Sequence, residues 1–233
     1  MNKKDVIERL NKKAEKGDAP SQYLLGRYIL DAGGSKKKLE QGISWLQKSA
    51  EAGHALAELH LGQCLMVGQN MKRNRKRAFA LIHSAAKKRE PVAEYLLALC
   101  LEGGEGTTQD IEAAIAWYRK AARSGEPRAQ TRLGLAYLEG GGAPRAPKTA
   151  RIWFGKAAAQ DDPDACFFLG HLFLTGNGTR QDLTKASHYL HKAASLGDEE
   201  AATLLATLLA MGESADDEPK KKPAKKTRSA PNK

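Results

Sequence analysis

The residues of this sequence best suited to metal chemistry are two histidines near its C-terminal end. His188 and His191 are three positions apart, so on a helix they share one face and could serve a metal ion. No cysteine or carboxylate is spaced to complete their site, and the three cysteines form neither a CxxC pair nor an even-numbered disulfide framework. We therefore expect no metal site, no cofactor, and cysteines that remain thiols.

The sequence lacks several motifs that mark catalytic sites. It contains no G-x-x-x-x-G-K-[ST] phosphate loop, no G-x-S-x-G serine elbow and no H-E-x-x-H zinc helix. The run GGSKKK at 33–38 lacks the first glycine of a phosphate loop and the strand that should precede it. These absences predict a protein that has no catalytic residues and is not an enzyme.

Positive charge gathers in two loops of the N-terminal half and at the C-terminal end. The 233 residues contain 38 Lys and Arg against 27 Asp and Glu, a net charge of +11. Residues 219–233 contain seven cations and no acid. The loop cations would suit an acidic partner, or they could form a solvated loop edge. These cations are Lys36, Lys37, Lys38, Lys72, Arg73, Arg75, Lys76 and Arg77.

The elements that position these residues follow a repeat with a period of 36 residues. A leucine followed by a small residue recurs six times, first at Leu25 and Gly26 and last at Leu205 and Ala206. Each unit reads as a helix, a glycine-rich loop, a second helix and a short turn. The period therefore predicts an all-α fold, a right-handed α-α superhelical solenoid of about six helix-loop-helix repeats.

The composition of the second helices indicates how the units pack. Alanine or glycine at the crossing points would let neighbouring helices approach closely, and stacking would stabilise units that cannot bury an apolar face alone. A column of bulky residues should fill the space between one unit and the next, in a structural role. Its members are Trp45, Leu81, Trp117, Trp153 and Tyr189.

The repeats divide the chain into four parts. We expect a capping helix over 1–18, five repeats over 19–198, a second capping helix over 199–212 and a disordered basic tail over 213–233. The tail has no aromatic residues for base stacking, so any binding of nucleic acid or an acidic partner would be nonspecific. No stretch reaches the ~18 apolar residues of a membrane span, and no signal peptide is visible, so a cytoplasmic protein is predicted.

The period and the recurring pattern A…LG…G-G…D…A…W…KAA…G resemble the Sel-like repeat family, a group of tetratricopeptide-like solenoids with slightly longer units. The resemblance covers residues 1 to about 212 and is clearest in the copies that begin near Pro91, Pro127 and Pro163. It implies an adaptor or scaffold for macromolecular complexes, often bacterial, and implies no particular partner.

The first helix of each unit should line the concave face of such a solenoid. At two positions of this helix, one before and two after the recurring leucine, the residue type differs from repeat to repeat, while the leucine and the small residue recur. These two positions are three apart, so they lie on one face of the helix. They would suit an amphipathic helix or an extended peptide, although their leucines could instead pack against the next helix. This predicted groove comprises Leu24, Arg27, His60, Gln63, Leu96, Leu99, Arg132, Leu135, Phe168 and His171.

The sequence therefore predicts a non-enzymatic scaffold for protein–protein interaction, with a partner peptide or domain on its concave face. The alternative is a nucleic-acid- or anion-associated protein that uses the cationic loops and the basic tail. Binding through phosphates would weaken steeply with salt, which distinguishes the two hypotheses.

Overall fold

The computed structural model of the protein describes residues 3–216. Within this range the chain forms helices and no strand. The helices are α1 Lys3–Glu15, α2 Ala19–Ala32, α3 Lys36–Glu51, α4 Ala55–Val67, α5 Arg75–Lys87, α6 Pro91–Gly103, α7 Ile111–Arg123, α8 Pro127–Glu139, α9 Pro147–Ala158, α10 Pro163–Thr175, α11 Leu183–Ser195 and α12 Glu199–Asp216.

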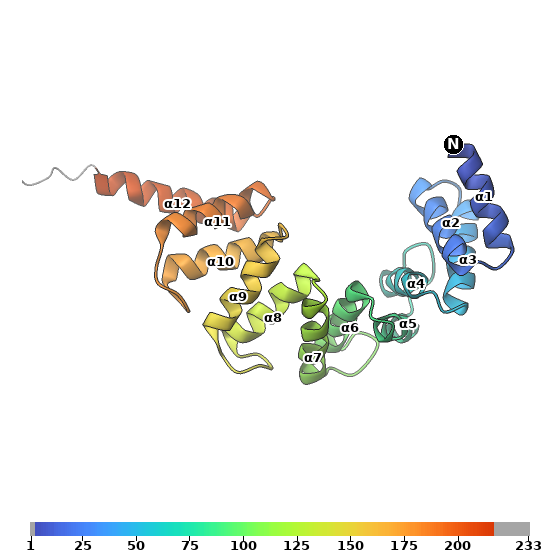
Figure 1. Cartoon of the computed structure of the whole chain (residues 1–233), viewed down its shortest axis with the longest axis horizontal. Coiled ribbons are helices and arrows are strands. Elements are labelled where there is room, and N and C mark those ends of the chain that lie inside the picture. The colour runs from blue at the N-terminus through green and yellow to red at the C-terminus, as the bar shows by residue number, and fades with distance from the viewer. Residues whose placement is uncertain (1–2, 217–233) are drawn as a thin grey trace, which may run out of the picture.

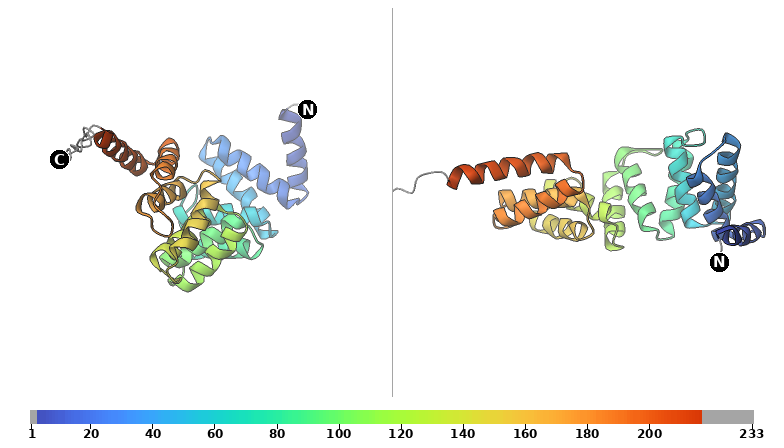
Figure 2. Two further views of the ribbon diagram at one scale, coloured as in Figure 1. Left: turned by 60° about the vertical axis from the view of Figure 1, so that its left-hand side comes forward. Right: turned by 90° about the horizontal axis from the view of Figure 1, so that it is seen from above.

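Each helix packs mainly against its neighbours in the chain, so the fold is a solenoid of helix pairs. The even-numbered helices α2 to α10 begin the repeats, and the odd-numbered helices α3 to α11 complete them. Figure 1 shows the pairs following an arc whose two ends rise on the same side, with α2 and α4 on its inner side. Seen from above, the same helices form one elongated row (Figure 2).

Local sequence signals begin and end the helices. Asp110 and Asp182 cap α7 and α11 by accepting the backbone N–H of the residue three positions on. At the other end, α4, α6, α8 and α10 each stop at a glycine in the left-handed conformation, as the glycine-rich loops predicted. These signals recur at the repeat period and fix the length of each unit.

The short turn between repeats requires a positive φ even where the glycine of the pattern is missing. Gly53 has φ +79° and Gly125 has φ +97°. Arg89 and Asp161 occupy the same position in other copies and adopt φ +63° and +60°. A non-glycine residue is strained in this conformation by about 1–2 kcal/mol.

The variant Arg89→Gly is therefore expected to raise the free energy of unfolding by about 0.5–1 kcal/mol, because the relief of strain exceeds the extra chain entropy of glycine. Urea denaturation followed by circular dichroism measures the change. The matched control is Lys87→Gly, two residues away at the last residue of α5, which should lower stability by up to about 1 kcal/mol. A loss of stability in both variants would contradict the strain at position 89.

The core lies between the two helices of each repeat and along the row of repeats. The predicted leucine column is buried in its first five copies, with Leu97 and Leu133 fully inaccessible to solvent, and partly exposed at Leu205 in the last helix. The bulky column that includes Trp117 and Trp153 is only half buried. Trp117 does contact both the core of its own repeat and that of the preceding one, as expected. The largest fully buried side chains of the second helices lie one position later, at Leu46, Ile82, Tyr118, Phe154 and Leu190.

The closest helix crossing lies within each repeat, and the tryptophan column does not fill it. The small residues of the first helix instead face the column one position later, within the same repeat. A Cβ atom at Gly134 would lie 2.6 Å from Phe154 Cε1, and one at Gly62 would lie 2.8 Å from Ile82 Cγ1. The glycines thus permit the close helix crossing, and the buried side chain of the second helix occupies the space.

Neighbouring repeats are also joined by buried polar side chains. Gln22 and Gln130 donate from Nε2 to the carbonyl oxygens of Ala14 and Ala122, at 3.0 and 3.1 Å. These carbonyls lie in the last helical turn of the preceding unit, where they also accept the backbone N–H of Gly17 and Gly125 at 3.0 and 3.2 Å. The glutamine contact therefore adds a second hydrogen bond at a helix end and ties the next helix to it.

The two ends of the chain extend the row by one helix each. α12 continues to Asp216, four residues beyond the end expected at 212. The rest of the predicted tail, 217–233, lies outside the described residues. Among the helices that the structure describes, none is both long and apolar enough to cross a membrane.

Candidate functional site

Three pockets along the solenoid are each lined mainly by the first helices of adjacent repeats, and two of them share Gln63 and Gln69. The N-terminal pocket, of about 170 Å³, includes Arg27, His60 and Gln63. The central pocket, of about 530 Å³, includes Gln63, Leu96 and Leu99. The C-terminal pocket, of about 460 Å³, includes Arg132, Leu135 and Phe168. Eight of the ten predicted groove residues thus line a pocket, and Gln63 lines two.

The remaining two groove residues lie outside the pockets. Leu24 is 52% exposed on α2. His171 is exposed on α10, where its ring centroid lies 6.5 Å from that of Phe167. The predicted columns therefore follow the inner face, but the structure divides them among local depressions rather than one continuous groove.

The central pocket is the most apolar of the three. Met66 and Val67 line it beside Leu96 and Leu99, and Val67 is 69% exposed. Cys100 also lines it, and burial raises the pKa of this thiol to about 11, so the group stays protonated and unreactive at neutral pH. This pocket can receive an apolar side chain but offers little for covalent chemistry.

The N-terminal pocket is small and its charges are already paired. Arg27 Nη2 lies 3.3 Å from Asp31 Oδ2, and Nη1 donates to the Tyr23 hydroxyl at 3.4 Å. Burial lowers the pKa of His60, whose ring packs edge-on against Tyr23 at a centroid distance of 5.4 Å. A neutral histidine beside a paired arginine gives this pocket little net charge.

The C-terminal pocket combines aromatic rings with charge. Tyr95, Phe167 and Phe168 contribute the rings. Phe168 stacks on the fully buried Phe154 with their centroids 5.3 Å apart. Two arginines and four carboxylates surround the rings, namely Arg128, Arg132, Asp162, Asp164, Asp198 and Glu200.

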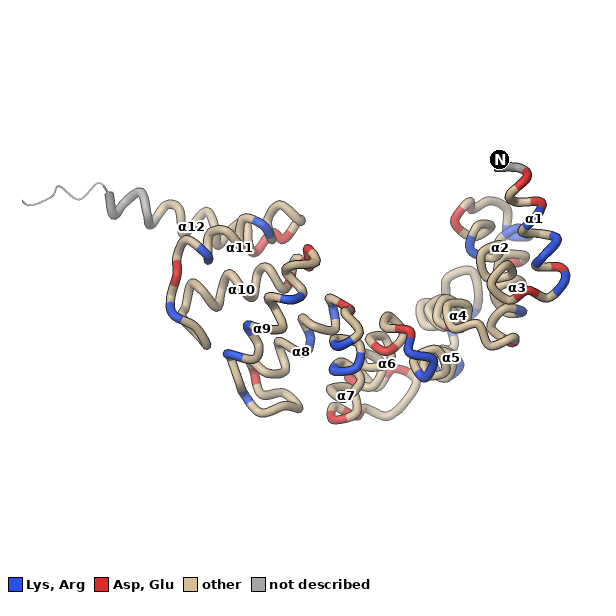
Figure 3. The backbone as a smooth tube through the Cα atoms, viewed as in Figure 1, with Lys and Arg blue, Asp and Glu red and all other residues tan. Residues whose placement is uncertain are grey.

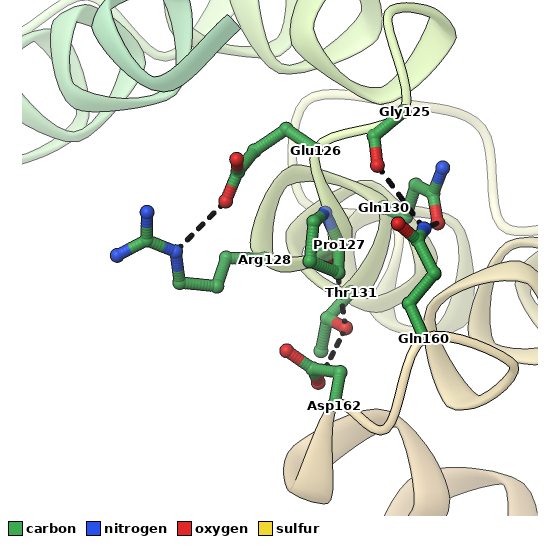
Figure 4. Close-up of polar contacts among 8 residues, drawn as sticks. All are labelled: Gly125, Glu126, Pro127, Arg128, Gln130, Thr131, Gln160 and Asp162. Atoms are coloured by element: carbon green, nitrogen blue, oxygen red, sulfur yellow. Dashed lines mark hydrogen bonds and ion pairs between the residues drawn. The ribbon is translucent and has the colours of Figure 1, made fainter. Parts of the chain in front are cut away.

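Hydrogen bonds at the start of α8 and α10 hold the wall of the C-terminal pocket (Figure 4). Asp162 caps α10 at the N–H of Ala165 and accepts the Thr131 hydroxyl at 2.9 Å. Arg128 Nε donates to Glu126 at 2.8 Å. The pocket is therefore built from the fixed N-terminal turns of adjacent repeats.

The residues of the predicted cationic patch are exposed, and they lie in the first turns of α3 and α5 and in the loop before α5. Three of them have side-chain contacts. Arg75 Nε lies 2.8 Å from Glu105 Oε2, Arg73 Nε donates to the Met66 carbonyl at 3.0 Å, and Lys36 Nζ lies 3.9 Å from Glu40 Oε1. Figure 3 shows consecutive basic residues at the start of α5. Within the described residues, no ion pair engages Lys72, Lys76 or Arg77.

The two histidines whose spacing could serve a metal ion lie on α11. His188 and His191 are both exposed on α11. Over the part of the chain that the structure describes, no three His, Cys, Asp or Glu side chains come close enough to hold a metal ion.

Sequence reasoning missed the acidic wall of the C-terminal pocket. Arg128, Asp164 and Glu200 are 36 positions apart and occupy the first turns of α8, α10 and α12. The same period that located the groove columns therefore brings these three together. The change from a basic residue to two acidic residues at these equivalent positions was the signal in the sequence that could have revealed the pocket.

Stacked helix pairs of this length define an α-helical repeat protein of the tetratricopeptide-like class. A family model of the Sel1 repeat matches residues 19–54, 55–89, 91–126, 127–162 and 163–198. The chain therefore belongs to the Sel1 repeat family, whose members are generally protein-interaction scaffolds.

Solved structures agree with this assignment. A protective antigen of uropathogenic Escherichia coli with an SLR fold is 32% identical, with a TM-score of 0.82 over 88% of this chain and 44% of the antigen. This chain thus spans less than half of that protein. A Sel1 repeat protein from Oxalobacter formigenes is 27% identical, with a TM-score of 0.77 over 84% of this chain and 78% of its own. A comparison with curated protein sequences finds no match.

Proposed function

We propose that this protein is a non-catalytic scaffold that binds a partner protein along the inner face of its solenoid. The observation that carries the proposal is the row of pockets on the first helices, in which exposed apolar side chains such as Val67 remain uncovered. An exposed aliphatic or aromatic depression with a polar rim is the usual anchor for a peptide or helix. The general role of the Sel1 repeat family supports the same conclusion.

A variant with two substitutions outside the core tests this proposal. Val67→Glu with Arg132→Glu should reduce capture of the partner by at least about tenfold, because one change places a charge in the apolar pocket and the other reverses a charge in the C-terminal pocket. Affinity capture from the protein's own organism with quantitative mass spectrometry measures the loss. The matched control is Ile152→Glu, which changes an aliphatic residue of 53% exposure that lines none of the three pockets.

The same experiment examines the anionic-partner alternative. Lys72→Glu with Lys76→Glu and Arg77→Glu avoids the two arginines that contact Glu105 and Met66. Under the scaffold proposal this variant captures the same partner as the parent. Loss of capture in this variant alone, with a steep dependence on salt in the parent, would instead favour binding of nucleic acid or another polyanion.

A further inference from the structure

The charges of the C-terminal pocket are unevenly matched. Arg128 pairs with Glu126 at 2.8 Å and Arg132 lies 3.8 Å from Glu102, so both arginines face carboxylates that do not line the pocket. Among the described residues, neither Asp164 nor Glu200 has an ion-pair partner. The pocket therefore keeps unpaired negative charge, although the chain as a whole carries +11.

The acidic residues also repel one another. Partial burial, together with the carboxylates of Asp162 and Asp198, raises the pKa of the Asp164 carboxyl, and Arg132 only partly offsets this. A carboxylate in the first helical turn is favourable by itself, but the approach of several carboxylates from two repeats is not. A cation placed among them beside the Phe167 and Phe168 rings would relieve the repulsion and contact the aromatic faces.

The chain itself carries a suitable group of cations after its last described helix. Residues 219–233 contain Lys220, Lys221, Lys222, Lys225, Lys226, Arg228 and Lys233 and no carboxylate side chain. α12 connects the two features, because its first turn contributes Glu200 to the pocket and its last described residue is Asp216. Figures 1 and 2 show α12 projecting beyond the rest of the solenoid, so the segment would have to return along it.

The length of the chain decides which cations can return. α12 rises about 24 Å from Glu200 to Asp216, at ~1.5 Å per residue. An extended backbone covers at most about 22 Å from Asp216 to Lys222, but up to about 36 Å from Asp216 to Lys226. The backbone of the second group of cations, at 225–228, therefore reaches the pocket with length to spare, whereas that of the first group falls short of it.

We propose that the basic segment 219–233 of this chain docks in its own C-terminal pocket, with Lys225, Lys226 and Arg228 facing Asp164 and Glu200 over the aromatic rings. Attachment through α12 gives the segment an effective concentration of the order of millimolar, so a weak contact suffices. Since Arg132 and Phe168 line the same pocket, the docked segment would compete with a partner for this part of the inner face. The proposal does not depend on the identity of that partner.

The test measures binding of a labelled synthetic peptide, with the sequence of residues 217–233, to the full-length chain by fluorescence anisotropy at low ionic strength. In the parent, the chain's own segment should occupy the pocket and keep the peptide out. The variant K225Q/K226Q/R228Q should bind the peptide at least about tenfold more tightly than the parent does. The matched control K220Q/K221Q/K222Q removes the same charge, but its affinity for the peptide should stay within about twofold of the parent's, because Lys225, Lys226 and Arg228 still occupy the pocket. Adding D164N and E200Q to the first variant should weaken binding at least about tenfold, while circular dichroism shows an intact fold.

Several results would overturn the proposal. The peptide could bind no variant, bind parent and variants equally, or bind regardless of D164N and E200Q. Equal gains in the two triple variants would indicate general charge rather than reach. Sedimentation of the parent shows whether it is an oligomer. If the parent binds the peptide more tightly once the oligomer dissociates, the segment occupies the pocket of a second copy and not that of its own chain.

Discussion

The variant Phe154→Ala is expected to lower the free energy of unfolding by about 3–5 kcal/mol. Phe154 is fully buried in α9, rests on Gly134 of α8 and stacks on Phe168 of the next repeat. Because its ring occupies the crossing of two helices, alanine would leave a cavity that the close-packed backbones cannot fill by collapsing. Urea denaturation followed by circular dichroism at 222 nm measures the loss.

The neighbouring residue supplies the control for this prediction. Trp153 is larger than Phe154 but only half buried, and Lys156 Nζ lies 4.2 Å from its ring centroid. Trp153→Ala should therefore cost less than about 2 kcal/mol, because much of the removed surface was already exposed to water. If Trp153→Ala proved the more damaging change, the orientation of α9 described above would be wrong.

The period of the sequence predicted the helix pairs because each column has one place in the packing. The small residue after the leucine must be small, since a second helix crosses there, and its spacing of 36 gives the length of one repeat. What the pattern did not settle was which of two adjacent bulky columns faces this crossing. The columns of Trp153 and Phe154 both consist of bulky apolar residues with one tyrosine each, so composition does not distinguish them.

The site was less predictable than the fold, because pockets are formed between repeats and between columns. The sequence placed Leu96, Leu99 and Phe168 on one face, but the structure places the first two in the central pocket and Phe168 in the C-terminal pocket. Loop residues such as Gln69 and Glu105 close the central pocket, and their positions depend on the turn conformation. The packing pattern of a helix pair does not predict the positions of these loop residues.

The loop between α6 and α7 shows how the repeats hold one another. Gly106 has φ +77° and touches the start of α5 in the preceding repeat, where an added Cβ would lie 2.6 Å from the carbonyl carbon of Arg75. Glu105 forms its ion pair with the Arg75 side chain at the same contact. Gly142 and Gly178, one and two periods later, pack in the same way against Ile111 and Pro147.

Gly106→Ala is therefore expected to lower the free energy of unfolding by about 2–5 kcal/mol, from about 1–2 kcal/mol of left-handed strain and about 1–3 kcal/mol of steric overlap. Gly103→Ala is the matched control, because Gly103 lies in α6 with a helical backbone and its new Cβ would meet only the Glu105 side chain at 3.5 Å. That change should be neutral or stabilise the helix by up to about 1 kcal/mol. Equal midpoints for Gly106→Ala and the parent in urea would show that the loop is not held against α5. Since the contact joins two repeats, hydrogen exchange should increase on both sides of it, in α5 and in α6, because a solenoid transmits stability only through its interfaces.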